Sequence, residues 1–129
     1  MKLTKKKEKS LHKRLNAKIW KLFSYWIRER DGYKCFTCDK LEKPGQAGHR
    51  YHGALDYDVI NVNNQCTHCN KWLHGNLGEY ERRLRIKYGD EAIEDLRTRA
   101  KQIWKPSTQE LEDLLAHWTD EVEKINKGS

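Results

Sequence analysis

The sequence lacks any apolar run long enough to cross a membrane. No stretch approaches the ~18 consecutive apolar residues that a transmembrane helix needs. The basic N-terminus is not followed by an apolar segment, so it does not have the form of a secretory signal. We therefore expect a cytoplasmic protein with no membrane partner. In that compartment its four cysteines are more often metal ligands than disulfides.

Hydrophobic residues are also scarce. They make up 36% of the 129 residues, against 35% for charged residues. A chain of this length is enough for one domain, but its core would be small. Domains with small cores commonly depend on a metal or a disulfide for stability. No internal repeat is visible, and the only low-complexity tract is a lysine-rich segment at the N-terminus.

Positive charge is concentrated in residues 1–18, MKLTKKKEKSLHKRLNAK. This segment holds eight Lys or Arg residues and one Glu, a balance of +7 that equals the net charge of the whole chain. The other 111 residues therefore balance to zero. A basic arm, flexible or helical, on a neutral body favours docking on nucleic acid. The predicted phosphate contacts are Lys5, Lys6, Lys7, Lys9, Lys13 and Arg14. The alternative is a disordered tail that only increases solubility.

A single domain is predicted from residue 19 to residue 129. Apolar residues recur at helical spacing through 19–31, and Asp31-Gly32 marks the end of that helix. Residues 33–75 are rich in Cys, Gly and Asn. Within them we predict short strands near 46–51 and 57–60.

Amphipathic helices are predicted over residues 76–127. Gly89 would end the first of them, and Asp90 would cap a second that ends at Lys105-Pro106. Ser107 and Glu110 form a capping-box pattern at the start of a third. The apolar stripe of this last helix, which includes Trp118, is either core or the contact surface of a homodimer.

Two C-x-x-C motifs, Cys35–Cys38 and Cys66–Cys69, flank the middle of the chain. Each can form a knuckle that directs two thiolates at one metal ion, and two knuckles give a tetrahedral zinc site. Four protein ligands leave no open coordination position, so this zinc would be structural. A redox pair of reactive thiols is the weaker alternative, because two paired motifs suit a metal better.

One histidine and two asparagines lie between and beside the knuckles. His49 is followed by Asn61 and then by Asn70, which comes directly after the last cysteine. This spacing resembles the H-N-N form of the HNH nucleases, also called ββα-metal or His-Me finger enzymes. In that pattern a histidine ends the first strand, an asparagine lies in the loop after the second strand, and an asparagine begins the helix.

The chemistry of phosphodiester hydrolysis accounts for these residue types. A neutral imidazole can deprotonate water near pH 7, so His49 is the candidate general base. The carbonyl of Asn61 could accept a hydrogen bond from one imidazole nitrogen and fix the tautomer. A side-chain oxygen from Asn70 suits a catalytic Mg²⁺ or Mn²⁺. The alternative is that His49 is a solvated loop residue and that Asn61, Asn63 and Asn64 are turn residues.

A closer resemblance covers most of the chain. The segments IRERDGYKCFTC, AGH and NVNNQCTHCNKWLHGN, followed by Tyr80, are similar to the phage NinG family of Rap-like recombination endonucleases. The resemblance implies a metal-dependent DNA endonuclease that acts on branched recombination intermediates such as Holliday junctions and D-loops. It also implies a bacteriophage origin and work in the cytoplasm of the bacterial host.

The catalytic metal site departs from the usual pattern. Most HNH enzymes have an acidic or histidine ligand immediately before the base, where this chain has Gly48. Relatives with the AGH motif often carry Asp directly before the motif, at the position of Gln46 in this chain. Glutamine binds Mg²⁺ more weakly than a carboxylate does. Asp56 or Asp58 could contribute instead, and His74 is a further candidate ligand or phosphate contact.

The prediction as a whole is an α+β fold, mainly helical, with a zinc-stapled ββα-metal core flanked by amphipathic helices. Selectivity for branched DNA would come from shape, because nothing in the sequence resembles a base-reading helix. Further predicted DNA contacts are Arg50, Lys71, Arg82, Arg83 and Arg85. The competing hypotheses are a non-catalytic zinc-ribbon module that binds DNA and an adaptor that recruits a partner through its C-terminal helices.

Overall fold

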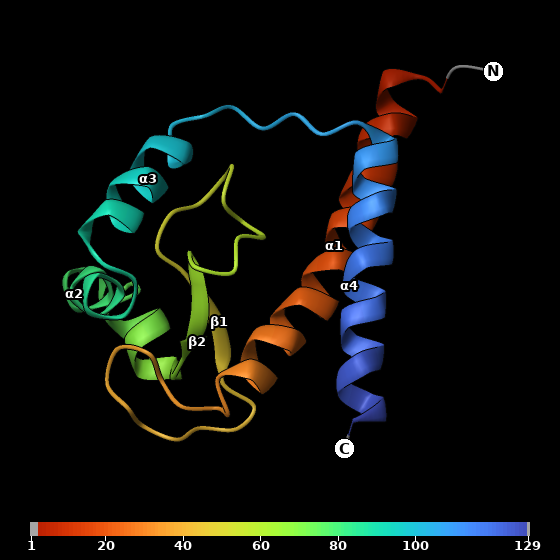
Figure 1. Cartoon of the computed structure of the whole chain (residues 1–129). Helices are drawn as coiled ribbons and strands as arrows, with labels where there is room; N and C mark the ends of the chain where they lie inside the picture. Colours follow the sequence, from red (N-terminus) through yellow and green to blue (C-terminus); the bar gives the residue numbers. More distant parts are fainter. Residues whose placement is uncertain (1–2, 129) are drawn as a thin grey trace. The chain divides into compact units, whose positions relative to one another are not determined.

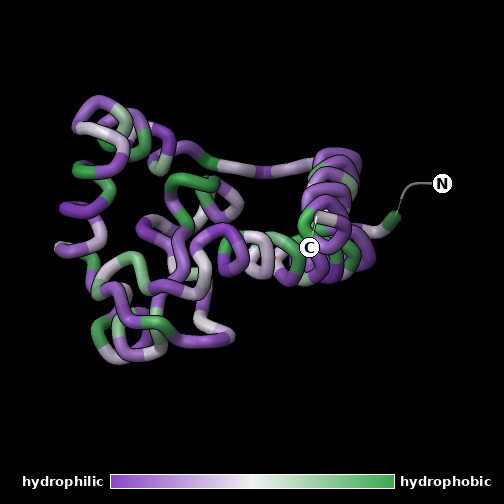
Figure 2. Tube along the Cα trace, turned by 60° about the horizontal axis from the view of Figure 1, so that its bottom comes forward, coloured by the Kyte–Doolittle hydropathy of each residue, from purple (hydrophilic) through white to green (hydrophobic). Residues whose placement is uncertain are grey.

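The computed structural model describes residues 3–128, which form a mainly helical α+β fold with one small sheet (Figure 1). The elements follow the order α1 (Lys5–Arg30), β1 (Gln46–His49), β2 (Val62–Gln65), η1 (His68–Trp72), α2 (Leu77–Tyr88), α3 (Asp90–Ala100) and α4 (Thr108–Lys127). Hydrophilic residues occupy most of the trace, and hydrophobic ones interrupt them in short segments (Figure 2). No helix within the described residues combines the length and the apolar character needed to cross a membrane.

The chain packs as two compact units. One lies within residues 1–26 and 105–129, and the other spans Ile27–Trp104. The first unit pairs the N-terminal part of α1 with α4. His12 bonds to Thr108 at 2.8 Å and Tyr25 bonds to Asn126 at 3.2 Å, so the two helices run in the same direction. The predicted division of the chain at residue 18 stays a prediction.

Helix α1 begins much earlier than the predicted start at residue 19. Residues 5–18 are helical and continue directly into the amphipathic segment, while Met1 and Lys2 of the predicted arm lie outside the described residues. Leu15 supplies one more apolar turn ahead of Ile19, and both are buried. Burial of this stripe extends the helix toward the N-terminus, although the lysines preceding it contribute no core contacts.

Trp118 lies in the core of the first unit. Its ring centroid is 4.8 Å from that of Phe23 and 5.1 Å from that of Trp26, and its exposed fraction is 5%. The capping box predicted for α4 is confirmed: the amide of Glu110 donates to Ser107 Oγ, and Glu110 Oε1 accepts from the amide of Ser107, both at 3.1 Å. Trp118 is therefore not available as a dimer contact surface, because the chain's own aromatic side chains cover it.

The sheet of the second unit is a two-stranded antiparallel ladder. His49 pairs with Val62 at one end of the ladder, and Gln46 pairs with Gln65 at the other. The first strand is confirmed but shorter than the predicted 46–51. The strand predicted at 57–60 is wrong, because Asp58 Oδ1 accepts from the amides of Ile60 and Asn61 and holds that segment in a turn.

Helices α2 and α3 enclose a small core. It consists of Leu55, Tyr80, Leu84, Ile93 and Leu96. Gly89, with φ +89°, ends α2 as predicted, but the Asp90 side chain makes no capping bond to α3. Helix α3 ends at Ala100 instead of continuing to Lys105, and Ile103 is 84% exposed. With no core surface to bury there, residues 101–107 leave the helical path.

Candidate functional site

The four cysteines lie together in the second unit. All four are free thiols, and their Sγ atoms lie within 4.8 Å of one another. Cys38 Sγ is 3.7 Å from Cys66 Sγ. Four sulfur ligands at the usual Zn–S distance of ~2.3 Å form a tetrahedron whose edge is about 3.8 Å. The cluster could therefore hold a zinc ion, as the spacing of the motifs predicted.

The four sulfur atoms differ in their surroundings. The amide of Cys69 donates to Cys66 Sγ at 3.4 Å, and Asn76 Nδ2 donates to Cys69 Sγ at 3.7 Å. Burial raises the pKa of the Cys35 thiol, but contacts with the Thr37 hydroxyl and the Cys66 backbone outweigh it and lower the pKa to about 7. Burial raises the pKa of the Cys38 thiol to about 12, and it also raises the pKa of the Cys69 thiol. Zinc binds thiolates, so binding a zinc ion here would release protons from these two cysteines.

Strand β2 connects the two knuckles to the sheet through buried amides. All four of its residues, VNNQ, are fully buried although three of them are polar. Asn64 Nδ2 donates to the Lys34 carbonyl at 3.1 Å. Gln65 Nε2 donates to Thr37 Oγ1 at 3.1 Å and to the Gly75 carbonyl at 2.8 Å. The segments before, between and after the cysteines are thereby held against one strand.

His49 ends strand β1, as predicted, and lines a cavity of about 360 Å³. The other lining residues are Ala47, Arg50, His52, Asn70, His74, Gly75 and Leu77. The cavity therefore brings together His49, Asn70 and His74 from the end of β1, from η1 and from the loop that follows η1. With Arg50, a predicted DNA contact, four separately predicted site residues share one concave surface.

The ring of His49 is oriented by the loop between the strands. Its Nε2 lies 3.1 Å from the carbonyl oxygen of Asp56, which can only accept, so Nε2 carries the proton. In the neutral ring Nδ1 is then the basic nitrogen. Burial lowers the pKa of His49, and it outweighs the nearby Asp56 carboxylate, which raises it. The imidazole is therefore neutral at pH 7, the state that a general base requires.

Asn61 makes no side-chain hydrogen bond to His49 within residues 3–128, so that part of the prediction is wrong. It lies before strand β2 instead of after it, and its side-chain oxygen accepts from the amide of Tyr51 at 2.8 Å. Its Nδ2 donates to the carbonyls of Tyr51 and Leu55 at 2.8 and 2.9 Å. Asn61 thus closes the loop that carries Asp56, and it positions His49 only through that loop.

The candidate ligands for a catalytic cation contact one another. Asn70 Nδ2 donates to Gln46 Oε1 at 2.6 Å, so the Gln46 oxygen already has a partner and does not line the cavity. Asn70 and His74 do line it. Asp58, which was considered as a substitute ligand, is instead bonded to Arg99 at 2.8 Å. Of the candidate cation ligands, the Asn70 amide and the His74 imidazole therefore face the cavity.

Gly48 is required by close packing. A Cβ atom at this position would lie 1.9 Å from Gln65 Oε1 and 3.0 Å from Asn70 Oδ1. An acidic or histidine ligand at residue 48 would therefore displace the Gln65 side chain that ties the two knuckles together. The departure from the usual HNH pattern has a physical reason in the neighbouring strand.

The predicted DNA contacts differ in how they are held. Lys5, Lys6, Lys7, Lys9, Lys13 and Arg14 are all exposed along α1. Arg50 is largely covered: it lies 4.3 Å from the Tyr51 ring and 3.6 Å from Glu81. Lys71 is exposed at the end of η1. The structure thus presents lysines for phosphate contact on both units, whereas Arg50 lies in the wall of the cavity.

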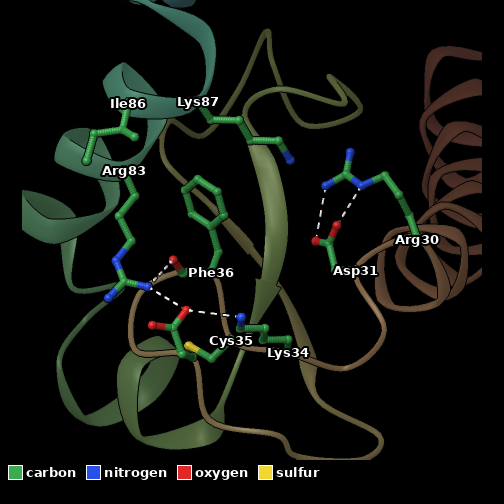
Figure 3. Close-up of a pocket in the computed structure, with 9 residues that line it drawn as sticks. Arg30, Asp31, Lys34, Cys35, Phe36, Arg83, Ile86 and Lys87 are labelled. Carbon is green, nitrogen blue, oxygen red and sulfur yellow. Dashed lines mark hydrogen bonds and ion pairs between the residues drawn. The ribbon is translucent and has the colours of Figure 1, made fainter.

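Arginines of α2 are engaged in ion pairs. Arg82 and Arg83 bond to Glu79, and Arg85 bonds to Asp90 and Glu94 at 3.1 and 3.2 Å. Arg83 also donates to the Phe36 carbonyl, on the wall of a separate cavity of about 460 Å³ (Figure 3). The same guanidinium donates to Asp39 Oδ1 at 2.9 Å. These arginines would exchange existing partners for phosphate, so they are weaker candidates for DNA contact than the exposed lysines.

The sequence did not predict three contacts of the site: the ring contact of His52 with His49, the bond of the Asp56 carbonyl to His49, and the buried bonds of the Tyr80 hydroxyl. The His52 ring centroid is 4.9 Å from that of His49, and its side chain lines the same cavity. The buried hydroxyl of Tyr80 donates to the Gly48 carbonyl at 2.7 Å and accepts from Asn63 Nδ2 at 3.1 Å. Only the ring contact of His52 had a signal in the sequence, because His52 stands three residues after His49.

Comparison with known proteins identifies the family. A family model described as "Bacteriophage Lambda NinG protein" matches residues 1–128. No curated protein and no solved structure matches the chain. Because the match covers nearly every residue, including both cysteine pairs and the loop between them, the chain belongs to the phage lambda NinG family.

Proposed function

We propose that this protein is an HNH-type endonuclease that hydrolyses phosphodiester bonds in branched DNA, in the cytoplasm of the bacterial host. The observation that carries the proposal is the cavity in which His49, Asn70 and His74 meet beside the four-cysteine cluster. Two antiparallel strands followed by a helical turn, with a histidine at the end of the first strand, support a ββα-metal core.

His49 is the proposed general base. With Nε2 donating to the Asp56 carbonyl, Nδ1 can take a proton from water as its oxygen attacks phosphorus and the bond to the leaving oxygen breaks. Asn70 and His74 would hold a divalent cation, either Mg²⁺ or Mn²⁺. Such an ion, when bound, neutralises charge on the phosphate and on the leaving oxygen. Asn61 has a positioning role through the loop of Asp56.

The role of the four cysteines in this proposal is to hold the site's frame. Cys69 lies directly before Asn70, and the amides of β2 connect both knuckles to the strand that pairs with His49. A zinc ion bound by the cluster would fix the separation between the base and the cation ligands. The exposed lysines of α1 would add affinity for any DNA through phosphate contacts.

Cleavage of a labelled four-way junction and of a matched linear duplex tests the proposal. Each is incubated with Mg²⁺, with Mn²⁺ or with no added divalent ion. Wild type should cut the junction only with a divalent ion, and His49→Ala should abolish cutting while it still binds. His68→Ala is the control, because its side chain is exposed and is not among the residues that line the cavity. We expect it to retain activity.

The second candidate function is a zinc-ribbon module that binds DNA without cutting it. The bond between Asn70 and Gln46 favours this alternative, because it occupies the Gln46 side-chain oxygen, which would otherwise be available to a cation. Tight junction binding with no cleavage under either metal, in a chain that retains its zinc, would select it. Equal loss of cleavage in His49→Ala and His68→Ala would also remove His49 from the role of base.

A further inference from the structure

Trp72 is the most unusual exposed residue near the proposed site. Its exposed fraction is 74%, although a side chain of this size and hydrophobicity normally buries most of its surface. Leu73 and Leu77, which follow it along the chain, are 44% and 42% exposed. Together with Lys71 these residues form what we call the Trp72 patch (Lys71, Trp72, Leu73 and Leu77).

The Trp72 patch adjoins the cavity of His49. A surface hollow of about 620 Å³ is lined by Thr67, Lys71, Trp72 and His74. His74 also lines the cavity of His49, and so does Leu77 of the patch. A DNA strand whose phosphate lies at His49 therefore passes within reach of the exposed indole.

The backbone around Trp72 is firmly held. Trp72 ends η1 only three residues after Cys69, whose side chain is 1% exposed within the cysteine cluster. The amide of Leu73 bonds to the His68 carbonyl and the amide of Gly75 bonds to the Cys69 carbonyl, both at 2.9 Å. A rigid support lowers the entropic cost of presenting an exposed aromatic ring to a ligand.

We propose that Trp72 stacks on a base exposed at a DNA branch point and so confers selectivity for branched over linear DNA; this inference rests on the proposed function. In continuous duplex the faces of the bases are covered by their neighbours. At a junction or fork, the terminal base of an arm offers an open face. Stacking on an aromatic ring depends little on base identity, which suits recognition of structure instead of sequence.

The charge of the patch fits a nucleic acid better than an apolar protein surface. Lys71 lies in the same hollow as Trp72 and could contact the phosphate of the stacked nucleotide. A helix of a protein partner would instead have to cover this ammonium group.

Equilibrium binding in a cleavage-deficient background tests this inference separately from the nuclease reaction. Dissociation constants for a fork with 2-aminopurine at the branch point and for a linear duplex of equal length are compared in His49→Ala, His49→Ala with Trp72→Ala, and His49→Ala with Trp72→Phe. We expect Trp72→Ala to weaken fork binding roughly tenfold or more while duplex binding is unchanged. The 2-aminopurine signal should change on binding only when residue 72 is aromatic.

Ile86→Ala is the matched control, because Ile86 is 71% exposed on α2 but does not line either hollow around His74. It should leave the fork preference intact. Zinc content and far-ultraviolet circular dichroism confirm that each variant is folded. The Phe variant should retain part of the preference, since a smaller ring still stacks.

Several outcomes would overturn the inference. One is an unchanged fork preference in Trp72→Ala, and another is an equal loss of affinity for fork and duplex. Loss of self-association with unchanged DNA selectivity would assign the patch to a protein contact instead. If wild type binds forks through Trp72 but never cuts them, the nuclease proposal fails and the stacking role stands. If it cuts junctions and Trp72→Ala is equally selective, only the stacking role fails.

Discussion

Replacing Tyr80 by Phe tests whether a single buried hydroxyl holds α2 against the strand that carries His49. The Tyr80 hydroxyl is fully buried, donates to the Gly48 carbonyl at 2.7 Å and accepts from Asn63 Nδ2 at 3.1 Å. It also lies 3.1 Å from the Asn61 carbonyl. Phe keeps the ring and its packing on Phe36, so the change removes only these polar contacts.

The expected loss of stability depends on which former partners of the Tyr80 hydroxyl keep another hydrogen bond. Asn63 Nδ2 still donates to the Ile60 carbonyl at 2.9 Å, and the Asn61 carbonyl still accepts from the amide of Arg50 at 2.9 Å. The Gly48 carbonyl loses a short bond in a buried place. A buried polar group left without its partner costs about 1–3 kcal/mol, so we expect Tyr80→Phe to lower the free energy of unfolding by about 2 kcal/mol.

Urea unfolding of the zinc-loaded chain, followed by circular dichroism, measures this change. Tyr88→Phe is the control: Tyr88 lies on the same helix and packs on the same core, and no hydroxyl bond of Tyr88 is found among residues 3–128. It should alter the free energy of unfolding by less than about 0.5 kcal/mol. A Tyr80→Phe variant as stable as wild type, or a Tyr88→Phe variant equally destabilised, would refute the reasoning.

Three further predictions concern packing, pH and metal. Gly48→Ala places Cβ 1.9 Å from Gln65 Oε1 and should destabilise the fold by about 1–3 kcal/mol in urea, whereas Gly78→Ala, with open space around it, should not. Burial lowers the pKa of His49 below the ordinary value of 6.5, so the folded chain keeps this imidazole neutral at a pH where the unfolded chain protonates it. The cleavage rate should therefore fall on the acid side only below pH 6.5, and the free energy of unfolding should decrease as the pH drops below 6.5. An acid-side loss of activity centred above pH 6.5 would contradict this prediction. Elemental analysis should find one zinc per chain. A chelator, which can reach the cluster at the exposed Cys38, should remove the zinc and lower the urea concentration at the midpoint of unfolding. Unchanged stability of the metal-free chain would count against a structural site.

Local patterns in the sequence predicted much of the candidate site. The two C-x-x-C motifs predicted a cluster of four thiols, because each motif needs only its own tight turn to direct two sulfur atoms the same way. His49 at the end of a strand and the capping box at Ser107 are likewise confirmed. Each cysteine pair, the strand end and the capping box depend on residues a few positions apart, so spacing and residue type are sufficient to predict them. That the two pairs would meet was inferred from the preference of zinc for four ligands.

The partners of the polar side chains could not be predicted in this way. Asn61 was expected to bond to His49, but it bonds to the backbone of Tyr51 and Leu55, because the loop between the strands folds back over it. Asn63 and Asn64 resembled turn residues, yet both are buried in β2 with partners from distant segments. An amide can donate or accept almost anywhere, so its sequence position says little about its partner.

The sequence by itself determined where the thiols, the candidate base and the basic segment lie along the chain, together with the apolar faces of its helices. Only the tertiary structure decided which of those faces remain open. Trp118 is covered by the chain's own aromatic residues, whereas Trp72 is exposed beside the cavity of His49. Both are tryptophans in helical segments. Their difference arises because burial depends on what the rest of the chain brings against a side chain.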